Sequence, residues 1–277
     1  MANLRITPRN FHDEATVTVS TAATGFPVTN TNNCIRSRTW RSTSTATATI
    51  SGTFSTGYYY RGNSLALFQH NGHGGFVRLE LFNDTAWTSV NYDTGTINLS
   101  NVSDPSTSYE WGLIGLGIDY NPFKALDPYW LYFQQSIFKS YRITLSGLVS
   151  PRTYWEVGRV FLGKHFTAGI NPAYGAALGM SDLTDSNRSR GGSLRTNVGA
   201  SWKTAAFDLN WMSEDDAISW LDIMRYCGTG RDFVISMFPE EVTRRERNNT
   251  FNAKFQSLDP IGRQVSYLTK RFQVVEV

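Results

Sequence analysis

Short runs of alternating apolar and polar residues, separated by turn residues, occupy the first half of the chain. Residues 16–20, 45–50 and 76–82 alternate with a period of two, and 76–82 is the clearest of the three. Beta-rich runs at this spacing are typical of an antiparallel sandwich, and this half shows no sustained 3.6-residue period. We therefore expect a β-sandwich domain over residues 1–150.

The second half of the chain indicates further strands, one helix and a polar arm. The strands are expected at 153–163, 174–180, 195–211, 233–238, 251–256 and 270–277. Residues 182–193 form the most polar stretch and are expected to be an exposed hairpin loop or arm. The pattern predicts a second, separate β domain over residues 151–277, carrying the helix.

The helix has the clearest signals in the chain. Ser213 is a good N-cap, and three acidic residues follow it where the helix dipole favours negative charge. Gly228 stands at the expected C-terminal stop. We predict a helix near 214–227 whose apolar face is formed by Ile218, Trp220, Leu221, Ile223 and Met224.

Composition excludes several classes of protein. Charged residues make up only 18% of the chain and the net charge is +3, so a phosphate-binding polycation is not indicated. The arginine and glutamate cluster at 240–247 fits a solvated loop or an interface ion-pair set. Two cysteines in different halves favour free thiols. The start of the chain shows no secretory signal, and the longest apolar stretch, 112–118, is far below the ~20 residues of a membrane span.

Part of the first half resembles the galactose-binding-like (discoidin) jelly roll. The Asn-rich loop 27–33, the Trp-Arg-Ser of 40–42 and the run 64–71 carry this resemblance. It implies that loops at one end of the sandwich bind sugars, with four candidate residues: Trp40, Arg41, His70 and His73. Trp40 would alternatively fill the core, and the two histidines would alternatively form a metal pair, although a flexible Asn-Gly turn is a poor scaffold for a metal.

The second half is similar to the tail-tube-like fold of distal tail proteins from long-tailed bacteriophages (siphophages). The resemblance rests on Gly-Arg-Val-Phe-Leu-Gly at 158–163, Asn-Pro-Ala-Tyr-Gly at 171–175 and Ser-Arg-Gly-Gly at 189–192, followed by the capped helix. Two departures are that the sandwich comes first here, and that the chain has no strongly charged stretch that would face a DNA channel.

This resemblance implies a baseplate or tail-tip ring in the virion, assembled in the host cytoplasm. Six copies are expected and three are the alternative, in contact with tail tube, tape measure and hub or central-fibre proteins. The sandwich would decorate the outside or touch a host surface glycan. The candidate interface residues are Asp185, Arg188, Arg190, Arg195, Arg244 and Arg245.

Catalytic motifs are lacking, so we expect a structural or binding protein and no enzyme, with neither cofactor nor metal. The sequence contains no nucleophile elbow, phosphate-cradling glycine loop, zinc spacing or calcium loop. Two alternatives stay open. One is a two-domain carbohydrate-binding (lectin-like) protein, and the other is a glycan-cleaving enzyme whose paired carboxylates meet only in space.

Overall fold

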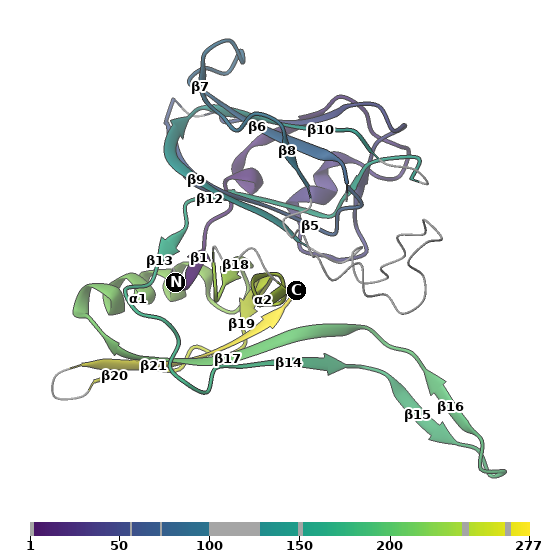
Figure 1. Ribbon diagram of the computed structural model, residues 1–277, viewed down its shortest axis with the longest axis vertical. Coiled ribbons are helices and arrows are strands. Elements are labelled where there is room, and N and C mark those ends of the chain that lie inside the picture. Colours follow the sequence, from purple (N-terminus) through teal and green to yellow (C-terminus); the bar gives the residue numbers. More distant parts are fainter. Residues whose placement is uncertain are drawn as a thin grey trace.

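The computed structural model describes residues 3–55, 57–72, 74–99, 128–148, 152–239, 244–263 and 267–277. Strands dominate these residues and form two β domains (Figure 1). The mainly-β fold class predicted from the alternation is confirmed. The apolar stretch 112–118 lies outside the described residues, and among those described no helix is both long and apolar enough to cross a bilayer.

Two antiparallel sheets face each other in the sandwich. The first contains β2 (Thr16–Val19), β4 (Ala48–Thr53), β6 (Phe76–Phe82), β7 (Val90–Asp93), β8 (Ile97–Asn98) and β10 (Ser140–Ser146). Its order is β2-β4-β10-β6-β7, with β8 beside β6. The second contains β5 (Tyr60–Phe68), β9 (Tyr129–Phe138) and β12 (Arg159–Gly163), in the order β12-β5-β9. The smaller elements are the two-stranded sheet of β3 (Trp40–Arg41) and β11 (Glu156–Val157) and the 3-10 helices η1 (Phe11–Glu14) and η2 (Val28–Asn32).

The sandwich core follows directly from the period of two. In β6, Val77, Leu79 and Leu81 are buried, because alternate side chains of a strand point to one face of its sheet. They join a cluster that also contains the fully buried Trp40 and Trp155. Burial of this much aromatic and aliphatic surface is the main contribution to the stability of the sandwich.

The second domain is built on one long antiparallel sheet and α1 (Glu214–Cys227). Its strands are β1 (Arg5–Thr7), β13 (Phe166–Thr167), β14 (Ala177–Asp182), β17 (Ser201–Met212), β18 (Phe233–Ser236), β19 (Thr250–Phe255), β20 (Gly262–Arg263) and β21 (Leu268–Glu276). The order is β13-β1-β18-β19-β21-β17-β14, with β20 beside β21. The helix packs on this sheet, with the Trp220 and Phe272 ring centroids 4.5 Å apart.

The predicted helix is confirmed, but its buried face differs from the prediction. Ser213 Oγ accepts a hydrogen bond from the Asp216 amide, and Gly228 follows the last helical residue. Ile218 and Leu221 are about half exposed, at 53% and 47%. The face that packs on the sheet is formed by Ala217, Trp220, Ile223, Met224 and Cys227. Trp220, Ile223 and Met224 were predicted correctly. Alanine and cysteine are weakly apolar, so the sequence pattern favoured Ile218 and Leu221 in place of Ala217 and Cys227.

The boundary predicted at residue 150 is shifted, because the sandwich is inserted into the second domain. β1 precedes the sandwich in the chain but pairs with β13 and β18 of the long sheet. The run 157–163, predicted to open the second domain, instead supplies β11 and β12, and β12 pairs with β5 of the sandwich. All five residues of β12 are buried, which makes this run a sandwich strand covered on both faces.

A buried arginine joins the two domains. Arg159 of β12 is 3% exposed and forms ion pairs with Asp13 of η1 and with Asp232, which precedes β18. The Nε–Oδ2 distance to Asp232 is 2.9 Å, and Nη2 donates to Asp13 at 2.7 Å. Burial raises the pKa of Asp13, although Arg159 opposes this shift. Because the carboxylates come from separate domains, one guanidinium fixes their relative position.

A second contact between the domains involves Glu246, which belongs to the arginine and glutamate cluster predicted at 240–247. Residues 244–249 form the short helix α2 (Arg244–Asn249) rather than a loop. Glu246 is 2% exposed and accepts a hydrogen bond of 2.7 Å from Trp130 Nε1 in β9. This carboxylate is therefore an interdomain contact and not a solvated charge. Residues 240–243 lie outside the described part of the chain.

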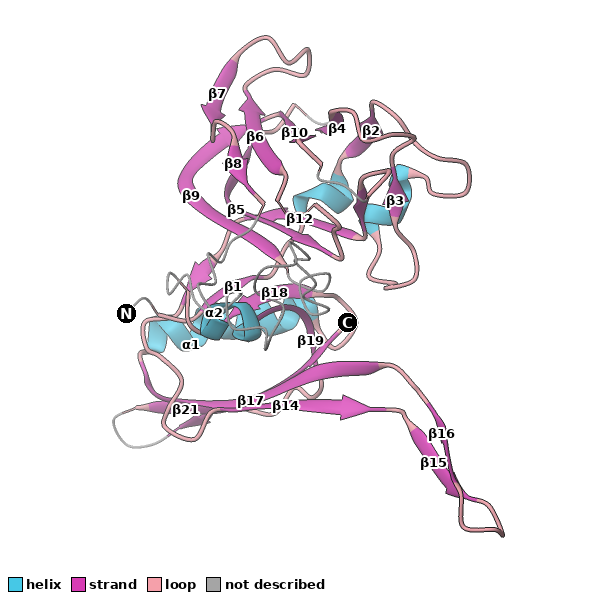
Figure 2. Cartoon of the chain, turned by 45° about the vertical axis from the view of Figure 1, so that its right-hand side comes forward, coloured by secondary structure: helices cyan, strands magenta, loops and turns pink. Residues whose placement is uncertain are grey.

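The predicted polar arm is a projecting β-hairpin. Beyond β14 and β17 the chain continues as β15 (Asp185–Arg188) and β16 (Leu194–Asn197), which pair only with each other (Figures 1 and 2). Every residue of β15 and β16 is exposed. The arm carries the exposed apolar side chains of Leu183, Leu194 and Val198, and Met180 at the end of β14 is also exposed. A lone two-stranded hairpin is marginally stable in water, so this arm has surface left to bury.

Candidate functional site

The four residues predicted to bind sugar differ in accessibility. Trp40 is 0% exposed and its Nε1 donates to the Thr21 carbonyl at 3.0 Å, so no ring face is available for stacking. Trp40 therefore fills the sandwich core, which was the alternative to a sugar-binding role. His70 is 3% exposed, with Nδ1 accepting from the Gly72 amide. His73 lies outside the described residues. Of the four, Arg41 is the one seen partly open to solvent.

Arg41 lies in a cluster of planar groups at the surface of the sandwich. Its guanidinium carbon is 4.0 Å from the centroid of the Phe26 ring and 5.0 Å from that of Tyr154. Nε and Nη2 both donate to Glu156 Oε1, at 3.1 and 3.0 Å. Thr39 Oγ1 donates to the same oxygen at 2.7 Å. We call Phe26, Thr39, Arg41, Tyr154 and Glu156 the arginine cluster.

Two polar groups of the arginine cluster keep free hydrogen-bonding capacity. Arg41 Nη1 and Glu156 Oε2 make no hydrogen bond with any residue that the structure describes. The two side chains are 31% and 21% exposed, so both groups are reachable from solvent. A planar donor beside a carboxylate acceptor, flanked by two aromatic rings, is suited to a hydroxyl-rich ring with one apolar face.

Strand pairing and a neighbouring amide assemble the arginine cluster. β3 and β11 align Arg41 directly opposite Glu156, residues more than 100 positions apart in the chain. Asn71 supports β11 from the side, because its Nδ2 donates to the Tyr154 carbonyl and its Oδ1 accepts from the Glu156 amide. Sequence inspection missed Phe26, Tyr154 and Glu156. The alternation in Tyr154-Trp155-Glu156 signals a short strand, but nothing in it indicates pairing with β3.

The predicted interface residues divide between the arm and α2. Asp185, Arg188 and Arg195 lie in the exposed strands of the arm, and Arg190 is in its turn. Arg188 Nη1 donates to the Gly192 carbonyl at 3.2 Å, so this side chain stabilises the turn of its own hairpin. Arg244 and Arg245 are the first residues of α2. Four of the six predicted residues therefore belong to the arm and two to α2, and their role in an interface stays a prediction.

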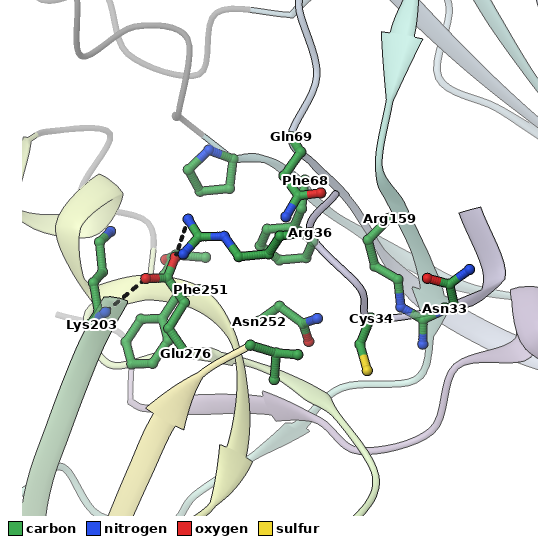
Figure 3. A pocket seen from close by; sticks show the side chains of 13 residues that line it. Asn33, Cys34, Arg36, Phe68, Gln69, Arg159, Lys203, Phe251, Asn252 and Glu276 are labelled. Atoms are coloured by element: carbon green, nitrogen blue, oxygen red, sulfur yellow. Dashed lines mark hydrogen bonds and ion pairs between the residues drawn. The ribbon is translucent and has the colours of Figure 1, made fainter. Parts of the chain in front are cut away.

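The narrow space between the domains is a structural contact and no ligand site. A cavity of about 40 Å³ lies there, with side chains from both domains around it (Figure 3). Arg36 crosses it, donating from Nη1 to the Ser201 carbonyl at 3.0 Å and approaching Glu276 at 3.9 Å. This volume holds a few water molecules at most. Within the described residues, no group of three or more His, Cys, Asp or Glu side chains is arranged to hold a metal ion.

Comparisons with known proteins give similarities in structure only. No family model matches the chain, and no curated protein matches it. Similar solved structures include chitosan-binding module 1 of a chitosanase/glucanase from Paenibacillus sp. IK-5, at 13% identity and a TM-score of 0.39, covering 56% of this chain and 98% of that one. Another is the Clostridium perfringens module CpGH89CBM32-5 in complex with GalNAc-beta-1,3-galactose, at 9% identity and 0.39, with coverages of 57% and 99%.

A third similar structure is the CBM32 of AlyQ in complex with 4,5-unsaturated mannuronic acid. It has 20% identity and a TM-score of 0.34, and the coverages are 53% of this chain and 92% of that one. Each module is matched over nearly its whole length and this chain over little more than half. The names of these modules refer to carbohydrate ligands.

Proposed function

We propose that this protein binds a carbohydrate through the arginine cluster of its sandwich domain, without cleaving it. The observation that carries the proposal is the pair of unused groups, Arg41 Nη1 and Glu156 Oε2, on an ion pair whose guanidinium contacts the rings of Phe26 and Tyr154. A sugar diol presents both a donor and an acceptor, and its C–H face packs on an aromatic ring. Sugar recognition was the expectation from the jelly-roll resemblance, and the arginine cluster keeps Arg41 from that expectation but surrounds it with other residues.

The arginine cluster is also prepared for binding before any ligand arrives. Two hydrogen bonds to Glu156 Oε1 and two ring contacts hold the Arg41 guanidinium in one orientation, and the hydrogen bond from Thr39 Oγ1 fixes that carboxylate oxygen. Little side-chain entropy is then lost on binding, which favours affinity from a small contact area. A lysine at this position would keep the charge but lose the planar donor and its ring contacts.

A glycan array followed by calorimetry tests this proposal. We expect wild-type protein to bind at least one glycan class, and Arg41→Lys and Glu156→Gln each to weaken that binding at least tenfold. Arg78→Lys is the matched control, since Arg78 is another exposed arginine of the sandwich, paired with Asp93 at 2.6 Å. Equal affinity in all three variants, or no glycan bound by the wild type, would refute the site.

We propose, as a second function, that the arm assembles copies of this chain into a ring. The specific observation is a hairpin whose strands are exposed throughout and pair only with each other. Closed symmetry follows when one head-to-tail contact repeats and returns on itself. On the resemblance to distal tail proteins, we propose that this ring is a virion tail tip of six copies, with three as the alternative, whose sandwich domains turn outward to a host glycan. The insertion of the sandwich between β1 and β13 supports this resemblance, because a strand of the second domain then precedes the sandwich, which lessens the departure in domain order.

Truncation of the arm tests assembly separately from sugar binding. Replacing residues 184–198 by a short Asn-Gly turn removes β15 and β16 and leaves the β14–β17 pairing in place. We expect analytical ultracentrifugation to show oligomers for the wild type and monomers for the truncated chain, with the same thermal midpoint at low concentration. An oligomer that survives truncation, or a wild type that stays monomeric at all concentrations, would contradict the proposal.

A further inference from the structure

A bulge near the end of β17 turns Trp211 out of the core of the second domain. Leu209 is buried, so regular alternation would bury residue 211 on the same face of the sheet. Leu209 pairs with Lys270 and Met212 with Leu268, which leaves two residues of β17 opposite one of β21. Met212 therefore takes the next core position, at 2% exposure, and Trp211 is 66% exposed.

Trp211 also holds a backbone conformation that bulky residues rarely adopt, with a φ of 69°. Its ring stacks on that of Tyr267, with the ring centroids 3.8 Å apart, and we call these two residues the aromatic pair. An unfavourable backbone conformation that places a large ring in solvent does not serve core packing. Such conformations concentrate at functional sites, and exposed aromatic rings are enriched in protein interfaces.

The surroundings of the aromatic pair are acidic. The first three residues of α1, directly after β17, are Glu214, Asp215 and Asp216. The cation beside them is Arg263 of β20, whose Nη2 lies 4.0 Å from Glu214 Oε1. Two pairs of opposite charge, Asp259 with Lys270 and Asp208 opposite Arg271, leave the balance unchanged. Three carboxylates against one guanidinium give this end of the sheet a net formal charge of −2.

The arm has the complementary properties. Residues 183–198 contain three arginines and one aspartate, so their net formal charge is +2. Leu183, Leu194 and Val198 of the arm are 68%, 58% and 82% exposed. The arm leaves the long sheet where β17 begins, and the aromatic pair lies where β17 ends (Figures 1 and 2). The 12 residues of β17 separate the two surfaces by about 40 Å, and the arm points away from the aromatic pair of its own chain.

We infer that the aromatic pair and the acidic start of α1 are the docking surface for the arm of a second copy of this chain. The inference rests on the proposed assembly through the arm and names the other half of that contact. A contact between opposite ends of β17 in two copies is head-to-tail, which is the kind that closes into a ring. The apolar side chains of the arm cover the rings, and its arginines meet the carboxylates. A sugar stacked on the rings would leave the apolar side chains of the arm uncovered, so the arm is the better match.

Analytical ultracentrifugation of two full-length variants, alone and mixed, tests this docking surface. One is Trp211→Ala, which keeps the arm, and the other is the chain with residues 184–198 replaced by an Asn-Gly turn, which keeps the aromatic pair. We expect each to be monomeric alone. An equimolar mixture should form a heterodimer and nothing larger, because one variant supplies the arm, the other supplies the docking surface, and no second contact remains.

Tyr58→Ala is the matched control, since Tyr58 is an aromatic residue of the sandwich with 73% exposure. This variant should keep the oligomer of the wild type. Raising the salt concentration from about 0.1 M to about 0.5 M should weaken association of the wild type, because exposed charges are screened. Association that does not weaken with salt would remove the charge complementarity and overturn the inference.

The remaining outcomes separate this inference from the proposed assembly. A Trp211→Ala chain that still forms the wild-type oligomer, while truncation of the arm abolishes it, overturns the docking surface and leaves the assembly proposal standing. Two monomeric variants that form no heterodimer on mixing also overturn the docking surface, as does a Tyr58→Ala chain that dissociates equally. A wild type that is monomeric at all concentrations overturns both proposals.

Discussion

Acidification from pH 7.5 to pH 5 should destabilise this protein through one buried histidine. His12 of η1 is 0% exposed, with Nδ1 2.5 Å from Tyr141 Oη and Nε2 2.7 Å from Thr31 Oγ1. Burial, reinforced by the charge of Arg159, lowers the pKa of His12 to about 3. The folded protein therefore keeps this imidazole neutral throughout the interval, and the unfolded chain protonates it below its ordinary pKa of about 6.5.

The sign and size of the effect follow from proton linkage. Where the unfolded state binds more protons, the free energy of unfolding falls as the pH falls. Each pH unit below about 6.5 costs about 1.36 kcal/mol, so the loss by pH 5 is about 2 kcal/mol. The raised pKa of Asp13 acts in the opposite direction, because the folded state then gains a proton first. A comparison with a variant that lacks only the histidine isolates the His12 contribution.

Urea unfolding of wild type and His12→Asn at pH 7.5 and pH 5 measures this loss. We expect the variant to be less stable at pH 7.5, because asparagine cannot reach both Tyr141 and Thr31. Between the two pH values, however, the wild type should lose about 2 kcal/mol more than the variant. Equal losses in the two proteins, or an NMR titration midpoint for His12 near its ordinary value, would refute the reasoning.

Three further predictions concern packing, capping and the domain junction, each measured by chemical or thermal unfolding. Trp220→Ala should cost about 3–5 kcal/mol because Trp220 is 0% exposed, and the half-exposed Leu221→Ala should cost clearly less; a larger loss at Leu221 would mean that the helix packs by its other face. Ser213→Ala should cost about 1 kcal/mol by removing the Oγ acceptor of the Asp216 amide, and an unchanged midpoint would contradict this cap. Arg159→Met should cost about 3–5 kcal/mol, because it leaves Asp13 and Asp232 facing each other without their cation, and a stable variant would show that the junction does not depend on the ion pairs.

Local patterns were sufficient for most individual elements of this fold. The runs 16–20 and 76–82 and the capped helix appear where the sequence places them, because alternation and capping act between near neighbours. The ten-residue strand β9 was missed, since its aromatic residues at the start and polar residues in the middle do not alternate cleanly. Whether a segment forms a helix depends on near neighbours, but which face of the helix is buried depends on what packs against it. Leu221 was therefore predicted to be buried and is half exposed.

Long-range pairing was the part that no local pattern could supply. The insertion of the sandwich depends on β1, a three-residue strand whose partners lie in β13 and β18. Arg41 was predicted to bind sugar from its neighbours in the chain, but its partner Glu156 is brought to it by β3–β11 pairing. Trp40 was predicted as a sugar-binding candidate and is buried. In a sequence, an aromatic residue beside an arginine is equally compatible with a core position and with a binding surface.

The insertion has a consequence for the order in which the chain folds during synthesis. Ile6 of β1 pairs with Ile235, so β1 leaves the ribosome roughly 10–45 s before its partner in β18 at usual elongation rates. The sandwich is complete once β12 has emerged, so it can fold in the interval. Its folding brings the two ends of the insert together, and Ile6 then lies opposite Phe166 of β13. We therefore expect the sandwich, once folded, to bring β1 and β13 together as the first strand pair of the second domain, which lowers the loop-closure entropy of the remaining pairings.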